Sequence, residues 1–141
     1  MATTTATITL ASSDIGDNAI SISNTSTLYT AGTDTGITET TGLARVKTST
    51  GSNTVLLDFG LTSGVAQDVT ADKSAKVYIK NINDRGDGTK YVDILIKTRE
   101  IGRLYGGDWM FIPWSGGSGE DIEYTASDTT ETTLEYCVFY E

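Results

Sequence analysis

The chain has 141 residues, with 25 Thr, 15 Gly, one Pro, one Cys and no His, and its formal net charge is -9 at pH 7. This length suits one domain with a core of its own, so folding needs no disulfide or structural metal. The lack of His excludes Ser-His-Asp and Cys-His triads, His-bearing zinc sites and HExxH metalloproteases, and the acidic balance disfavours nucleic acids and anionic membranes as partners.

The predicted elements are short strands, because Thr, Val, Ile and Tyr favour strands and apolar residues alternate with polar ones. In chain order, the strands are expected at residues 6–10, 20–23, 53–59, 76–80, 91–96, 100–105, 108–114, 121–125 and 132–140. The turn-rich residues 83–89 predict that 76–80 and 91–96 pair as a hairpin. The best helical candidate, 69–76, spans at most two turns. The pattern predicts an all-β fold, with a single antiparallel β-sandwich or barrel domain over residues 1–141.

Residues 24–54 carry the weakest pattern, with many Thr, Ser and Gly and few apolar residues. We interpret this segment as a long loop, two edge strands or an extended arm that binds a partner. Neither a signal peptide nor a membrane-spanning run is predicted, and we expect synthesis in the cytoplasm.

Charge is distributed unevenly along the chain. Residues 1–72 hold 7 acids and 2 bases, residues 73–103 hold 4 acids and 8 bases, and residues 104–141 hold 8 acids and no base. One interpretation is that the basic and acidic segments are neighbours in a sheet and pair across strands. The other is that they form complementary patches on neighbouring copies or on a partner.

The motifs give little support to catalysis or to a cofactor. Asn83–Thr89 echoes a calcium loop, but Arg85 and Ile94 stand where oxygen ligands are needed, so a turn is the better interpretation. Residues 115–120 lack the Lys-Ser or Lys-Thr of a phosphate loop, and the acidic cluster that follows them is interpreted as a solvated loop. No pair of acids is set in an apolar context, so we expect no enzyme and no cofactor. Cys137 is predicted to be a buried thiol.

The aromatic residues near the end of the chain allow two interpretations. In residues 108–114, Trp109 and Phe111 alternate with Met110, Ile112 and Trp114, so one set must face the core and the other is free for a ligand or a neighbouring subunit.

The strand series from residue 76 onward resembles small virion structural proteins of tailed bacteriophages, particularly marine and cyanobacterial ones. The likeness lies in residues 76–81, 91–96, 101–114, 121–126 and 134–139, and the Thr-rich opening of the chain is similar to their N-terminal regions. The resemblance implies a β-sandwich of jelly-roll type that packs on a phage particle. It transfers no active-site residue.

The function implied by this resemblance is a capsid decoration or cement protein that stabilises the phage head by binding between capsid subunits. It would be made in the cytoplasm of the bacterial host and located in the virion. Its partner would be the major capsid protein or another virion protein. It would form a homo-oligomer, and a trimer is favoured. The candidate interface residues are Tyr105, Trp109, Trp114, Tyr124, Arg85, Lys90, Arg99 and Arg103. The alternatives are a tail, connector or fibre protein, and a carbohydrate-binding module with Trp109 or Trp114 as its platform.

Overall fold

The structure is a computed structural model that describes residues 3–16, 19–30, 32–48, 52–59, 66–67, 75–86, 88–115, 119–127 and 132–140. These residues form strands, turns and irregular segments and contain no helix, so none of them belongs to a helix that could cross a membrane. The predicted all-β fold is therefore confirmed, and the expected helical turn at 69–76 lies mostly outside the described residues. The chain divides into two compact units, Met1–Thr38 and Glu39–Glu141.

The first unit contains one antiparallel hairpin of β1 (Thr5–Ser12) and β2 (Ile20–Thr27). After β2, a single bridge joins Tyr29 to Gly36. Most side chains of both strands are exposed, including those of Leu10, Ile20 and Ile22. Burying the exposed part of one such aliphatic side chain stabilises a protein by roughly 1 kcal/mol.

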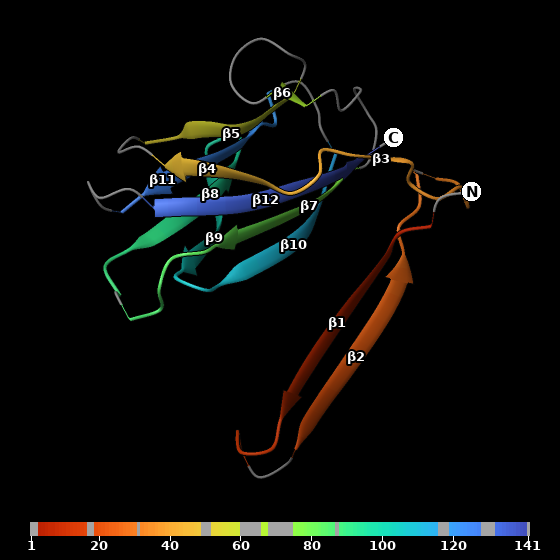
Figure 1. Ribbon diagram of the computed structural model, residues 1–141, viewed down its shortest axis with the longest axis horizontal. Coiled ribbons are helices and arrows are strands. Elements are labelled where there is room, and N and C mark those ends of the chain that lie inside the picture. The colour runs from red at the N-terminus through yellow and green to blue at the C-terminus, as the bar shows by residue number, and fades with distance from the viewer. Residues whose placement is uncertain are drawn as a thin grey trace. The chain divides into compact units, whose positions relative to one another are not determined.

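The described residues of the second unit form ten strands. They are β3 (Glu39–Thr40), β4 (Ala44–Thr48), β5 (Thr54–Phe59), β6 (Ala66–Gln67), β7 (Ala75–Asn81), β8 (Tyr91–Ile96), β9 (Arg99–Tyr105), β10 (Trp109–Trp114), β11 (Ile122–Ala126) and β12 (Thr132–Tyr140). Strands β10, β7, β12 and β3 form one sheet in that order, and β4 also pairs with β12. Strands β6, β5, β11, β8 and β9 form the other sheet, in which only the β5–β6 pair is parallel. Figure 1 shows these strand neighbours, and the two open sheets give a sandwich-like arrangement rather than a closed barrel.

The core of the second unit takes residues from both sheets. One sheet contributes Val77 and Ile79 from β7 and Leu134 from β12, and the other contributes Val92 and Ile94 from β8; all five side chains are fully buried. Their alternation with polar residues is the period-2 pattern seen in the sequence, because successive side chains on a strand point to opposite faces.

The predicted hairpin between 76–80 and 91–96 is wrong. Strand β7 pairs with β10 and β12, whereas β8 pairs with β9 and β11, so residues 82–90 carry the chain from one sheet to the other. Both strands have an apolar face, and burying these faces on opposite sides of one core needs the two strands in different layers. A loop of this length is long enough to cross between packed sheets as well as to turn back.

The weakly patterned residues 24–54 hold the end of β2, the short strands β3 and β4, and the start of β5. Strands β3 and β4 both lie against β12, on the side opposite β7. The predicted burial of the Cys137 thiol is confirmed, and its Sγ lies 3.3 Å from Oγ1 of Thr40.

Asn81 links the two sheets at the end of β7. Its fully buried side chain donates from Nδ2 to the carbonyl oxygen of Leu104 on β9, at 3.1 Å, and accepts from the backbone N–H of Asn83, also at 3.1 Å. Its backbone accepts from Gly107, in the turn between β9 and β10. A Cβ on Gly106 would lie 2.3 Å from the backbone oxygen of Asp84, so only glycine fits there.

We predict that Asn81→Ala lowers the free energy of unfolding by about 1–3 kcal/mol, because the buried bond to the carbonyl oxygen of Leu104 and the partly buried bond from Asn83 are lost. Urea denaturation measures this change. Asn24→Ala, at an exposed position on β2, is the control and should change stability by less than about 0.5 kcal/mol. Equal effects of the two substitutions would contradict the linking role of Asn81.

Candidate functional site

Two of the predicted interface residues belong to the core. The side chain of Trp114 is 2% exposed and that of Tyr124 is 3% exposed. The indole N–H of Trp114 donates to the carbonyl oxygen of Glu120 at 2.7 Å, so its polar group is satisfied within the chain. In β10 the set of Met110, Ile112 and Trp114 therefore faces the core. Trp114 and Tyr124 are corrected from surface anchors to core residues.

Tyr105 and Arg103 lie on the outer face of the sheet that contains β8 and β9. The guanidinium of Arg103 binds the Asp93 carboxylate through Nε at 2.6 Å and Nη2 at 3.2 Å, and its Cζ lies 3.8 Å from the centre of the Tyr91 ring. The Tyr91 and Tyr105 rings are 5.5 Å apart. The hydrogen bond to Asp93, followed by that to Tyr105, raises the pKa of Arg103 above its ordinary value. These side chains hold one another in place.

Arg85 and Lys90 occupy the connection between the sheets. Nη2 of Arg85 lies 2.9 Å from Oδ1 of Asp108, and Oδ2 of the same carboxylate accepts from the backbone N–H of Tyr105 at 3.2 Å. This pair joins the basic middle segment to the acidic end, but it connects two loops and is not the cross-strand pairing that one interpretation of the charge pattern expected. Lys90 is half-buried and makes an interaction of its own within the chain.

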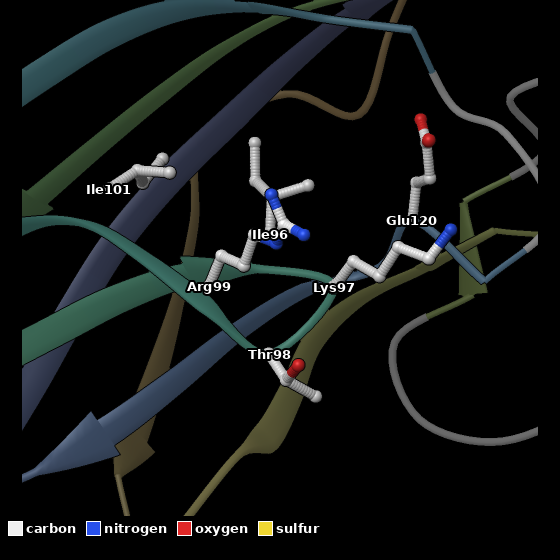
Figure 2. A pocket seen from close by; sticks show the side chains of 6 residues that line it. All are labelled: Ile96, Lys97, Thr98, Arg99, Ile101 and Glu120. Atoms are coloured by element: carbon white, nitrogen blue, oxygen red, sulfur yellow. The ribbon is translucent and has the colours of Figure 1, made fainter.

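Arg99 lines an open depression of about 710 Å³ beside the turn between β8 and β9 (Figure 2). The other lining residues are Ile96, Lys97, Thr98, Ile101 and Glu120.

The acidic cluster after residue 119 holds this turn in place. The backbone N–H of Thr98 donates to Oε2 of Glu123 at 3.2 Å, and that of Lys97 donates to the carbonyl oxygen of Asp121 at 3.2 Å. Oε2 of Glu120 accepts from Ser115. Across the described parts of the chain, no group of three or more acidic or sulfur ligands is arranged to hold a metal ion.

The outer face of the β10–β7–β12–β4 sheet combines basic and aromatic side chains. Because Val77, Ile79 and Leu134 face the core, the residues between them point away from it. We call this surface the basic-aromatic face, and its residues are Arg45, Lys47, Lys76, Tyr78, Lys80, Trp109, Phe111, Pro113, Thr133, Glu135, Cys137 and Phe139. It contains four bases, one acid and four aromatic rings, in a chain of net charge -9.

The strand register brings an aromatic ring and charges into one row across this face. Trp109 lies opposite Lys80, Lys80 lies opposite Glu135, and Glu135 lies opposite Arg45. The Glu135 carboxylate is bound by Arg45 at 2.9 Å. Within the row, the side chain of Trp109 is 49% exposed.

Tyr78 lies beside this row, with its ring centre 6.4 Å from that of Trp109. Partial burial, and secondarily the Glu135 charge, raise the pKa of the Tyr78 hydroxyl above its ordinary value. Tyr78 is therefore a neutral hydrogen-bonding ring next to the exposed indole.

Sequence reasoning found only Trp109 among the residues of this face. The alternation of Lys76, Tyr78 and Lys80 with Val77 and Ile79 was a signal that these three share a surface. Alternation within β7 does not reveal which strands pair with it, so the positions of β10 and β12 on either side of β7 could not be predicted. No known protein family, curated protein or solved structure matches this chain.

We predict that Thr98→Gly raises the free energy of unfolding by about 1 kcal/mol, as measured in urea. Lys97 and Thr98 have φ values of 51° and 64°, so this two-residue turn has the left-handed backbone of a type I′ turn without the glycine that it favours. Thr133→Gly, on β12 with an ordinary strand backbone, should instead lower stability by about 0.5–1 kcal/mol. A loss of stability in both variants would argue against strain at Thr98.

Proposed function

We propose that this protein is a structural virion protein, a decoration or cement protein that binds between capsid subunits on the head of a tailed bacteriophage. Its mechanism is burial of surface, which requires no catalytic residue and no cofactor. It is made in the host bacterium and acts in the virion.

The basic-aromatic face is the observation that carries this proposal. Trp, Tyr and Arg are the residues that most often dominate protein interfaces. Here Trp109 lies in one row with Lys80 and Arg45, and Tyr78 lies beside Trp109. Four of the ten bases of the chain are on this one face, so the surface fits a protein partner with acidic groups around an apolar contact.

Two other functions use the same exposed ring. A tail or connector protein would dock in the same way but at low copy number, about six or twelve per particle, whereas head decoration requires hundreds. Mass spectrometry of purified particles separates the two. A carbohydrate-binding module would stack a sugar on the half-exposed indole of Trp109, and it predicts glycan-array binding that Trp109→Ala abolishes.

We predict that Trp109→Ala weakens rebinding of the purified protein to particles that lack it by about tenfold or more, because an exposed aromatic anchor is removed. The measurement is the fraction of protein that cosediments with particles over a range of concentrations. Lys80→Glu should also weaken rebinding, and this effect should grow as the salt concentration is lowered. The reason is that the variant places a negative charge against acidic groups of the particle that the wild-type lysine attracts.

Tyr105→Ala is the matched control, because Tyr105 is 40% exposed but lies on the other sheet. It should leave rebinding within about twofold of wild type. The proposal is overturned if wild-type protein does not bind particles, and the choice of face is overturned if Tyr105→Ala weakens binding as much as Trp109→Ala.

A further inference from the structure

The β1–β2 hairpin gathers its large aliphatic residues on one of its two faces, which we call the apolar face. Cross-strand partners in an antiparallel pair share a face, so the register places Ala6, Ile8, Leu10, Ile20 and Ile22 there, together with Ser12, Asn24 and Ser26. Leu10 lies directly opposite Ile22, and both side chains are 55% exposed. The hairpin therefore presents an apolar face to solvent.

The opposite face is polar and satisfies itself. It is made of the cross-strand pairs Thr5–Thr27, Thr7–Thr25, Thr9–Ser23 and Ala11–Ser21. The hydroxyl oxygens of Thr7 and Thr25 are 2.9 Å apart, and those of Thr9 and Ser23 are 3.3 Å apart. This face suits contact with water, so any partner is expected on the apolar face.

The hairpin also lacks the features that keep strands apart. No Asp, Glu, Lys or Arg occurs in residues 1–13 or 18–33, and neither strand contains proline. Natural edge strands are usually protected by such residues. A two-stranded hairpin alone in water is marginally stable, and further strands or packing are needed to hold it.

We propose that the apolar face of the β1–β2 hairpin is buried against the same face of a second copy of this chain. The remainder of the chain carries the net charge of -9, so two copies repel one another except along this segment. A charged partner surface would leave its charges buried and unpaired against Leu10 and Ile22, whereas a second hairpin brings none.

The contact is symmetric about a twofold axis, so the same face of the hairpin is buried in both copies. Strands of eight residues make a ribbon about 27 Å long. One face of this ribbon is smaller than the roughly 800 Å² per partner of a stable interface. We therefore expect association that is reversible and depends on concentration.

The test is sedimentation velocity of the full chain from low micromolar concentrations to about 1 mM. Wild-type protein is expected to shift from monomer to a larger species. Leu10→Glu/Ile22→Glu should remain monomeric, and Thr9→Glu/Ser23→Glu should associate like wild type. Each variant places two acids directly opposite one another on the same hairpin, so both introduce the same repulsion and they differ in the face that they change.

Cysteine cross-linking gives a second readout. In the Cys137→Ser background, Leu10→Cys should form an intermolecular disulfide at least about tenfold faster than Thr9→Cys, because only the first thiol lies on the face that the two copies bring together. Wild-type protein that stays monomeric at every concentration overturns the proposal, as does equal association of the two acidic double variants. Self-association uses the hairpin of the first unit, whereas the proposed docking to particles uses the basic-aromatic face of the second unit. Either proposal can therefore fail without the other.

Discussion

The packing of two apolar sheet faces against each other is the constraint on which the second unit depends. Val77 and Ile79 from one layer and Val92 and Ile94 from the other are fully excluded from water. Once these strands are placed in opposite layers, the long connection must cross between sheets, and the chain must cross back between β9 and β10. Asn81 supplies the polar link at that crossing, where backbone groups would otherwise be buried without partners.

The same packing decides which charges share a surface. On β7 the side chains of Val77 and Ile79 face the core. The alternate residues Lys76, Tyr78 and Lys80 therefore lie on the outer face, on the strand next to Trp109. Salt bridges within the chain engage Arg103 with Asp93 and Arg85 with Asp108 on other parts of the surface. The excess of bases in the middle of the chain is thus divided between internal pairs and one sheet face, and both interpretations of the charge pattern keep a physical basis.

Alternation in the sequence predicted the strands but not their partners. It located β7 and β8 and their inward residues, because the period of two follows directly from strand geometry. It did not assign the two strands to different sheets, since a loop of that length can turn back or cross over. Alternation also did not show whether Trp109 or Trp114 faces the core, and the structure shows that Trp114 does. Strands within residues 24–54 were only one of the alternatives, because β4 offers one strongly apolar residue, Val46. The basic-aromatic face could not be predicted without the register of β10, β7 and β12.

The two strands of the hairpin carry no charge, and only Asp14 and Asp17 lie between them in the sequence, so the solubility of the chain depends mainly on acids located elsewhere. At neutral pH the carboxylates keep copies apart, but near the isoelectric point of about 4.3 that repulsion disappears while the aliphatic face and the open strand edges stay unchanged. Mild acid is then expected to turn a limited contact into open-ended strand pairing and precipitation. The acids in the rest of the chain therefore keep in solution a hairpin whose strands contain no charged residue.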